Sequence, residues 1–400
     1  MPNTVYQRIA ALRKFMENKG LHAFIVPSTD AHLSEYPAAH WLAREWLSGF
    51  TGSAGTVVVT RTDAALWTDS RYFLQAESEL QGTEIRLCKE GLSGVPSIEQ
   101  WLSERLEKGN NVGLDGNVYA AQEAFALIKK LNRAGLNVTA QYDPFDEIWR
   151  DRPPLPSGQV FVLPVEYAGV PASEKIRRLL VLLGKEGADA LLVASLDTSA
   201  WIFNLRGNDV KCNPVAVAYA YISHRETVLF INPQKLNEET ARYLKSEGVV
   251  LADYSRAGAY VASLHHVAIC LSGNKISYAL YNQIQPDCKI IDLIPSPADR
   301  MKSLKNEIEI KGFRNAMERD GAALVRFLMW LEKAVPSGNV SELTVVEKLS
   351  EYRSRQNLYV GESFDTIAGY GANGAIVHYH VSPATAATLK PEGFLLVDSG

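Results

Sequence analysis

The stretch Ser363–Gly400 reads SFDTIAGYGANGAIVHYHVSPATAATLKPEGFLLVDSG, and two pieces of it carry chemistry. One is Asn373–Tyr379, a polar turn predicted to run into a strand that bears His378. The other is Phe394–Gly400, an apolar strand that delivers Asp398 at its end. Because a buried strand excludes water, a carboxylate at its mouth is costly unless a positive partner lies there, and a metal ion is the usual partner. The stretch therefore predicts that Asp398 lies beside cations and that His378 borders the same cleft.

Each piece taken alone also has an ordinary structural explanation. Many aspartates that follow an apolar run simply begin a turn. A single histidine on a strand is more often a hydrogen-bonded structural residue than a catalyst. The functional interpretation therefore depends on the two pieces occurring together, in this order and at this spacing.

Length and composition indicate an ordinary globular protein with more than one domain. The chain has 400 residues, which exceeds what one hydrophobic core usually organises, so two or three domains are expected. Apolar residues make up 46% and charged residues 22%. The net charge is −4 and no basic cluster dominates, so nucleic acid and anionic membranes are poor candidates for the main partner.

Cysteine spacing and the absence of long apolar runs predict a soluble cytoplasmic protein. The four cysteines form no C-x-x-C pair and are interpreted as free thiols in a reducing compartment. The first residues lack the apolar core of a signal peptide. No apolar stretch approaches the roughly 20 residues that would span a bilayer.

A helix–strand unit occurs twice in the chain. An amphipathic helix with Ile9 and Leu12 on its apolar side ends near Gly20 and leads into a short apolar strand. The same pattern returns 167 positions later, which predicts two similar α/β domains with mixed sheets rather than a solenoid of short repeats. The matched pairs are Ile9 and Ile176, Leu12 and Leu179, Gly20 and Gly187, Ala23 and Ala190, Val26 and Val193, Ser28 and Ser195, and Asp30 and Asp197.

Two stretches rich in breaking residues divide the chain. Asp151–Gly158 and Pro295–Ala298 are predicted to be exposed joints. The predicted domains are residues 1–154, 158–297 and 300–400.

Local patterns predict several elements within these domains. Thr56–Thr60 and Val215–Ile222 are predicted strands. Gly49–Gly55 is glycine-rich but lacks a Gly-Lys-Ser/Thr ending and precedes a strand, so a turn is favoured over a phosphate-binding loop.

The third predicted domain opens with two helices. A long helix is expected over about Ser303–Val335, with a buried stripe comprising Leu304, Ile308, Phe313, Met317, Leu324, Phe327, Leu328 and Leu331. A second helix is expected to begin at Ser341-Glu342, with Leu343, Val346 and Leu349 facing inward.

The motifs NGAIVHY and LLVDSG resemble those of the pita-bread metallopeptidases, and most of all those of aminopeptidase P. FTGSAGT, WTDSRY and LRGNDV resemble the N-terminal domains of its three-domain members. The resemblance implies a fold of class α/β and α+β, in which two duplicated creatinase-like α/β N-terminal domains precede the start of a pita-bread metallopeptidase domain. Prolidase and creatinase have one N-terminal domain, so the repeat favours the three-domain enzyme.

The same resemblance implies a site and a reaction. Relatives hold two divalent metal ions with two Asp, one His and two Glu, and hard oxygen ligands suit Mn²⁺ best. Asp398 is expected to be the first of these five ligands, with the other four beyond Gly400, so the native polypeptide is expected to continue. His378 is expected to face substrate as a catalytic residue, and Phe364 to line a proline pocket, although an ordinary core position explains Phe364 equally well.

The resulting hypothesis is an aminopeptidase that removes the first residue from peptides whose second residue is proline. A homodimer is the implied assembly. Two alternatives stay open. One is a non-catalytic pita-bread protein that binds peptides or proteins, and the other is a prolidase-like dipeptidase.

Overall fold

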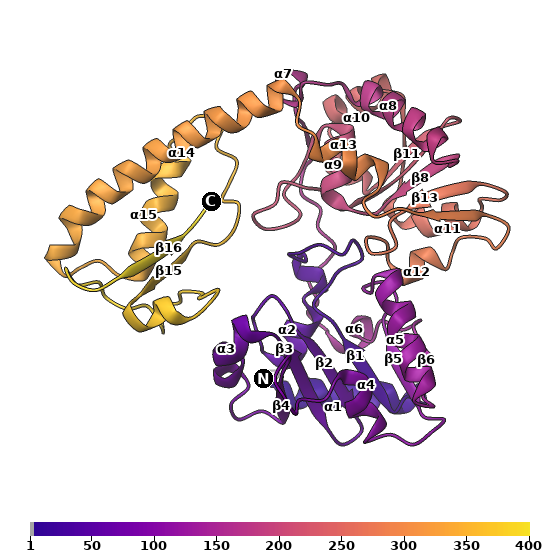
Figure 1. The fold of residues 1–400 in the computed structure, drawn as a ribbon, viewed down its shortest axis with the longest axis horizontal. Helices are drawn as coiled ribbons and strands as arrows, with labels where there is room; N and C mark the ends of the chain where they lie inside the picture. The colour runs from indigo at the N-terminus through magenta and orange to yellow at the C-terminus, as the bar shows by residue number, and fades with distance from the viewer. Residues whose placement is uncertain (1–3) are drawn as a thin grey trace. The chain divides into compact units, whose positions relative to one another are not determined.

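The computed structural model describes residues 4–400. Residues 23–139 contain a six-stranded mixed sheet of order β4-β3-β2-β1-β5-β6 (Figure 1). The central strand β1 runs antiparallel to β2 and parallel to β5. The strands are β1 (Ala23–Val26), β2 (Thr56–Thr60), β3 (Ala64–Thr68), β4 (Ile85–Lys89), β5 (Asn111–Leu114) and β6 (Asn137–Thr139).

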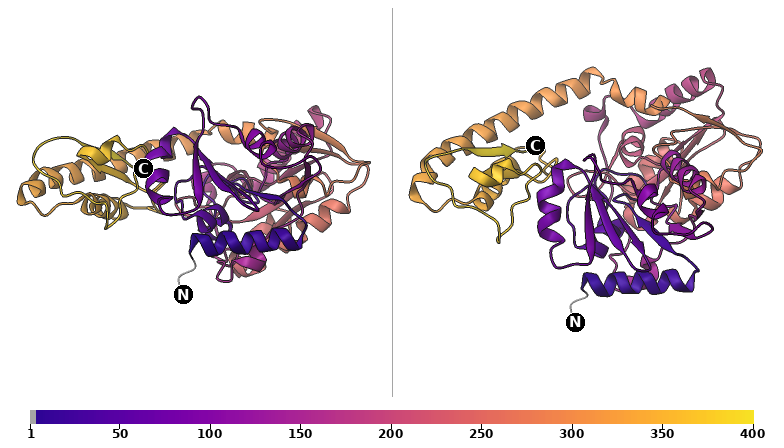
Figure 2. Two further views of the ribbon diagram at one scale, coloured as in Figure 1. Left: turned by 90° about the horizontal axis from the view of Figure 1, so that it is seen from below. Right: turned by 60° about the horizontal axis from the view of Figure 1, so that its bottom comes forward.

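Helices cover both faces of this first sheet. They are α1 (Val5–Asn18), η1 (Ala39–Trp41), α2 (Ala43–Ser48), η2 (Ser70–Tyr72), α3 (Phe73–Glu79), α4 (Ile98–Ser103), α5 (Ala121–Arg133) and α6 (Phe145–Ile148). The helix α1, indigo beside the N-terminus in Figure 2, packs Leu12 and Met16 against Phe24 on one face. On the other face, Ile25 packs in a cluster with Trp101 of α4 and Leu131 of α5.

A second six-stranded sheet repeats the topology of the first, in the order β12-β11-β10-β8-β13-β14. Its strands are β8 (Ala190–Val193), β10 (Ala218–Ser223), β11 (Thr227–Ile231), β12 (Val249–Ala252), β13 (Ala268–Leu271) and β14 (Lys289–Asp292). Its central strand β8 again has one antiparallel neighbour, β10, and one parallel neighbour, β13. The predicted strand at Thr56–Thr60 is confirmed as β2, whereas the strand predicted at Val215–Ile222 begins three residues later, at Ala218.

The helices of the second copy are α8 (Ala172–Lys185), α9 (Leu196–Phe203), η3 (Pro233–Lys235), α10 (Glu238–Ser246), η4 (Tyr254–Arg256), α11 (Ala257–Ala262), α12 (Tyr278–Tyr281) and α13 (Pro297–Ser303). A short pair of strands, β7 (Phe161–Val162) and β9 (Leu205–Arg206), lies outside the main sheet.

The predicted repeat is confirmed in detail. Both α8 and β8 begin and end 167 positions after α1 and β1. Gly20 follows α1 with φ 66° and Gly187 follows α8 with φ 70°, a left-handed conformation that glycine adopts without steric cost. The shared glycine is therefore what turns each helix back toward its strand.

The remaining elements belong to a compact unit formed by Pro164–Gly169, Lys211–Pro214 and Lys305–Gly400, distinct from the unit that holds both sheets. They are α7 (Val165–Ala168), α14 (Glu307–Ala334), η5 (Val335–Ser337), α15 (Glu342–Ser354), β15 (Ile367–Tyr370), η6 (Gly371–Ala375) and β16 (Leu395–Asp398). The strands β15 and β16 pair antiparallel and pack on a core that includes Phe327 and Leu349. The domain boundaries 1–154, 158–297 and 300–400 stay a prediction.

The long helix predicted over about Ser303–Val335 is confirmed as α14, but the burial predicted for its apolar stripe is wrong. The chain forms α13 and α14 separately, because Asn306 caps α14 with its side chain and stops the helix from continuing backward. Of the predicted stripe only Phe327 is fully buried, whereas Met317 is 67% exposed and Phe313 58% exposed. Periodicity identified the helix correctly but did not show which part of its apolar face is covered.

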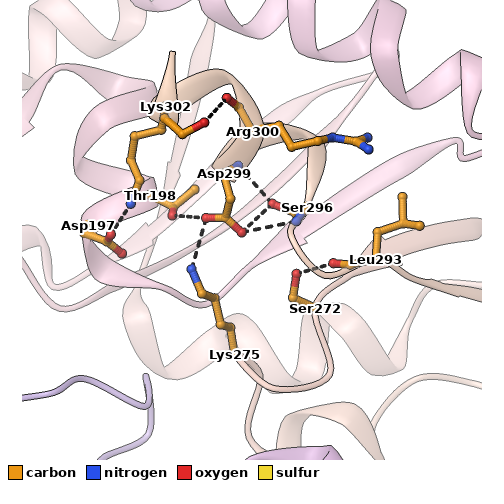
Figure 3. Close-up of polar contacts among 10 residues, drawn as sticks. Asp197, Thr198, Ser272, Lys275, Leu293, Ser296, Asp299, Arg300 and Lys302 are labelled. Carbon is orange, nitrogen blue, oxygen red and sulfur yellow. Dashed lines mark hydrogen bonds and ion pairs between the residues drawn. The ribbon is translucent and has the colours of Figure 1, made fainter. Parts of the chain in front are cut away.

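A buried carboxylate fastens α13 to α9 and to the loop that follows β13 (Figure 3). Asp299 accepts hydrogen bonds from the hydroxyls of Thr198 at 2.7 Å and Ser296 at 2.8 Å, and Lys275 lies 3.2 Å away. Burial alone would raise the pKa of Asp299, but the hydroxyl donors and Lys275 together lower it below the ordinary aspartate value. The carboxylate therefore stabilises the fold in its charged form.

Replacing Asp299 with asparagine should lower the free energy of unfolding by about 1–3 kcal/mol, because the amide cannot accept all three of these contacts. Since the folded pKa is lowered, this contribution is complete above the unfolded pKa of about 4 and is lost as the pH falls through the folded value. Urea unfolding of wild type and D299N from pH 7 to pH 3 measures both effects.

The matched control is Asp197→Asn, which removes the more exposed carboxylate that pairs with Lys302 in the same cluster. An exposed ion pair contributes under about 1 kcal/mol. Equal losses in the two variants would contradict a special role for Asp299.

Candidate active site

The predicted histidine lies on a turn rather than on a strand. After β15, the chain forms η6 over Gly371–Ala375 and then a turn that contains His378. His378 is exposed and has φ 56°, a left-handed backbone conformation that is uncommon for a residue with a side chain. The prediction of a strand at His378 is therefore wrong, because the chain forms a turn there. The glycines Gly371 and Gly374 favour a tight turn over an extended strand.

A fully buried carboxylate, Glu342, holds this turn in place. Glu342 is the first residue of α15 and is 0% exposed. Its carboxylate accepts hydrogen bonds from the backbone N–H of Tyr370 at 2.6 Å and of Ala387 at 2.9 Å. It also accepts from Nδ2 of Asn373 at 3.0 and 3.1 Å and from the hydroxyl of Tyr379 at 3.0 Å.

These donors satisfy the hydrogen-bonding capacity of the Glu342 carboxylate without a cation. Each donor in this group is neutral, and together they supply the several hydrogen bonds that a buried carboxylate requires. Burial raises the pKa of the Tyr379 phenol, Thr385 opposes that shift, and the Glu342 carboxylate adds to it. The phenol therefore stays protonated at neutral pH and remains a donor to Glu342.

Asp398 lies at the end of β16, opposite Ile367 in the ladder. Its side chain is exposed, and the strand is not the dry element that its apolar sequence predicted. Leu395 and Val397 are partly buried against the core, whereas Phe394 is 90% exposed and Leu396 is 46% exposed. Alternate residues of a strand face opposite sides, and here only one side is covered within residues 4–400.

A buried guanidinium anchors the residue after Asp398. Arg353, in the last turn of α15, is 5% exposed. It donates to Asp320 at 2.7 Å, to Glu362 at 3.2 Å and to the hydroxyl of Ser399 at 3.1 Å. The planar donor fork of arginine suits this divergent set of acceptors, so Arg353 fixes the end of β16 against α14 and the segment before β15.

Phe364 lies beside the same strand end. The N–H of Ser363 donates to the carbonyl of Gly400 at 2.8 Å, and a Cβ placed on Gly400 would lie 3.0 Å from Cε1 of Phe364. Phe364 is half-buried and belongs to none of the buried clusters within residues 4–400. The structure thus brings Phe364 and the end of β16 together, and the role of Phe364 stays a prediction.

A complete metal site is not formed by the described residues. Within residues 4–400, no group of three or more His, Cys, Asp or Glu side chains could hold a metal ion. Asp398 can supply one carboxylate ligand, and its chemistry suits a hard divalent cation.

None of the helices in residues 4–400 is both long and apolar enough to cross a membrane.

Comparisons with known proteins give three family matches that cover most of the described chain. Residues 8–148 and residues 151–309 each match a creatinase/prolidase N-terminal domain. Residues 311–400 match metallopeptidase family M24.

Nearly the whole of this chain is also similar to part of several curated proteins and of a solved structure. A protein of Botryotinia fuckeliana described as a probable Xaa-Pro aminopeptidase P is 38% identical over 98% of this chain and 62% of its own length. Xaa-Pro aminopeptidase 1 of Dictyostelium discoideum is 36% identical over 99% of this chain and 65% of its own length. The X-prolyl aminopeptidase of Caenorhabditis elegans, described as a cytosolic enzyme with a di-nuclear active site, superposes with a TM-score of 0.93 at 33% identity. That match covers 99% of this chain and 67% of the other.

This chain belongs to the aminopeptidase P family. Two creatinase-like α/β domains therefore precede a region of the pita-bread metallopeptidase domain, as the sequence predicted. The chain spans about three fifths of the length of curated aminopeptidase P proteins that it matches, such as 62% of the Botryotinia protein.

Arg353→Lys should loosen the end of β16, because a lysine ammonium cannot replace a fork that contacts three acceptors at once. We expect the free energy of unfolding to fall by about 1–3 kcal/mol. Backbone amides of β15 and β16 should also exchange faster with deuterium, which mass spectrometry of peptides from Ile367–Tyr370 and Leu395–Asp398 measures.

Arg355→Lys is the control at the C-cap of the same helix, since the Arg355 side chain is 63% exposed and pairs only with Glu351 among the ion pairs of residues 4–400. Its expected effect is below about 1 kcal/mol. Unchanged exchange at β16 in the Arg353 variant would contradict the anchoring role.

Proposed function

We propose that the complete protein is a metal-dependent aminopeptidase that hydrolyses the bond between an N-terminal residue and a following proline. The observation that carries this proposal is the similarity of nearly the whole of this chain to Xaa-Pro aminopeptidases, with the NGAIVHY turn and the LLVDSG strand at the end of the matched region. Its local support is the placement of Phe364 beside the strand end that bears Asp398.

We assign a role to each predicted site residue. Asp398 is proposed as one metal ligand, because its carboxylate is exposed at the end of a strand fixed by Arg353. His378 is proposed to donate a hydrogen bond near the scissile bond and to stabilise charge there, a role worth a few kcal/mol where water is excluded. Phe364 is proposed to contact the proline ring, which has no amide hydrogen and presents an apolar surface.

The cofactor proposed for the complete protein is a pair of divalent metal ions, most suitably Mn²⁺. Support comes from the M24 family match and from the di-nuclear site described for the Caenorhabditis elegans enzyme. Metal ions bound in this way would lower the pKa of a bound water molecule, so that hydroxide would be available at neutral pH to attack a carbonyl. Residues 4–400 do not form such a site by themselves.

Assembly and location are also part of the proposal. A homodimer follows from the family resemblance and is tested by light scattering of the purified protein. A cytoplasmic location is supported by the cytosolic location described for the Caenorhabditis elegans enzyme.

Two other functions remain as outcomes of the test. A non-catalytic pita-bread protein would bind Xaa-Pro peptides without cleaving them. A prolidase-like dipeptidase would cleave Arg-Pro but not longer peptides. The duplicated N-terminal domain favours the aminopeptidase over the dipeptidase.

The complete protein, incubated with Mn²⁺ and Arg-Pro-Pro, should release free arginine, and removal of metal with EDTA should abolish the release. Chromatography of the products measures cleavage, and plasma emission spectrometry measures bound metal. Re-addition of Mn²⁺ should restore activity. Binding of the peptide without cleavage by metal-loaded protein would favour the non-catalytic alternative.

Variants at Phe364 and His378 should separate binding from chemistry. Phe364→Ala should raise KM for Xaa-Pro peptides, because it removes apolar contact with the proline ring. His378→Ala should lower kcat by about 10²–10³-fold, since the lost hydrogen bond acts mainly on developing charge.

Steady-state kinetics with Arg-Pro-Pro measures both constants. Leu358→Ala is a matched surface control, because Leu358 is 62% exposed and lies before the predicted site. A His378 variant with wild-type kcat would remove this residue from the mechanism.

A further inference from the structure

Glu342 occupies a position that is costly for a structural residue alone. Its carboxylate is 0% exposed, and transfer of an ionised carboxylate out of water is expensive unless strong hydrogen bonds replace its hydration. A helix in this position could bury an apolar side chain instead, as α15 does with Val345 and Leu349. What the carboxylate adds is a set of directional contacts that an apolar side chain cannot make.

Those contacts converge on the turn that carries His378. Asn373 lies five residues before the histidine and Tyr379 lies directly after it, and both donate to the carboxylate of Glu342. Nδ2 of Asn373 also lies 3.0 Å from the hydroxyl of Tyr379, which closes the loop on itself. The two ends of the segment are therefore tied to one buried point.

The carboxylate also fixes what lies on either side of the turn. Its oxygen Oε1 accepts from the N–H of Tyr370 at the end of β15. The other oxygen, Oε2, accepts from the N–H of Ala387 on the chain that returns toward β16, and the backbone N–H of Glu342 donates to the carbonyl of Ala387 at 3.1 Å. One side chain thus sets the turn relative to β15 and to the segment at Ala387 that follows the turn.

The left-handed backbone conformation of His378 needs to be held by surrounding contacts. A residue with a side chain at φ 56° costs roughly 1–3 kcal/mol relative to its preferred conformations and persists where its surroundings fix it. Within the Asn373–Tyr379 segment, the hydrogen bonds to Glu342 are the ones that join its two ends to a helix. Weakening them should let the turn relax and move the imidazole.

We propose that Glu342 is a positioning residue that holds His378 in its working geometry without touching substrate. The structural part of this proposal stands on the contacts above. Its consequence for catalysis rests on the aminopeptidase function proposed in the preceding section.

The variant that tests it is Glu342→Gln in the complete, metal-loaded protein. Glutamine has nearly the same size, but its amide nitrogen is a donor and would face another donor at either oxygen position. We expect kcat/KM for Arg-Pro-Pro to fall by about 10²-fold, because a small misplacement of a catalytic group is enough to cause such a loss. The loss should lie in kcat rather than in KM.

A double-variant cycle separates positioning from general loss of stability. If Glu342 acts through His378, then E342Q should change kcat less than about 2-fold in a His378→Ala background. The control variant Phe327→Leu alters a fully buried residue of α14 in the same core, whose side chain has no hydrogen-bonding group to offer Glu342 or the turn. It should lower the thermal midpoint while leaving kcat near that of wild type.

A second measurement is independent of catalysis. In protein labelled with ¹³C at histidine Cε1, the His378 signal is assigned by its absence from the His378→Ala variant. E342Q should shift that signal and accelerate deuterium exchange of peptides covering 371–385, and F327L should do neither.

These outcomes separate the two proposals. Wild-type protein that retains metal but cleaves no Xaa-Pro peptide would overturn the proposed function, and the signal and exchange data would still decide the role of Glu342. A folded E342Q protein whose His378 signal and 371–385 exchange match wild type would overturn the positioning role. So would full additivity of E342Q and His378→Ala in kcat.

Discussion

The candidate site depends on two buried charges carried by one helix. Glu342 begins α15 and Arg353 lies in its last turn, about three helical turns away, so both point to the same side. Val345 and Leu349 fill the interval between them and pack in the core beneath β15. The apolar residues attach the helix to the ladder, and the charged residues decide how the chain on either side of the ladder is held.

Each charge fixes a different part of the site. The carboxylate of Glu342 collects donors from the turn that bears His378, whereas the guanidinium of Arg353 reaches the hydroxyl of Ser399, directly after Asp398. A buried ion is a weak source of net stability, because desolvation offsets much of what its contacts contribute. Its advantage is geometric, since several directional bonds must be satisfied at once and few backbone arrangements satisfy them. We infer that the helix contributes specificity of placement more than stability.

The sequence predicted the parts of the fold that depend on local pattern. Apolar periodicity located α1 and α8, and the glycines at positions 20 and 187 marked their ends, so the duplicated domains were correctly predicted. The predictions of a strand at His378 and of a buried Met317 were wrong. Both features depend on residues distant in the chain, which determine the turn geometry and which face of a helix is buried. Glu342 was recognised only as the start of a helix. Its donors lie 28 to 45 positions further along, and no periodicity connects them.

Glu342 and Asp398 are both carboxylates near the predicted site, and their different surroundings give them different roles. Glu342 has its hydrogen-bonding capacity filled by neutral donors and is sealed from solvent, so it has no oxygen left to offer a metal ion or a substrate. Asp398 is exposed at a strand end, and its carboxylate accepts no hydrogen bond from residues 4–400. A metal ligand must be both fixed in position and free to bind. Arg353 fixes the position of the strand end through its hydrogen bond to Ser399, and the exposure of Asp398 leaves its carboxylate free to bind. The proposal of Asp398 as a metal ligand therefore depends on both residues.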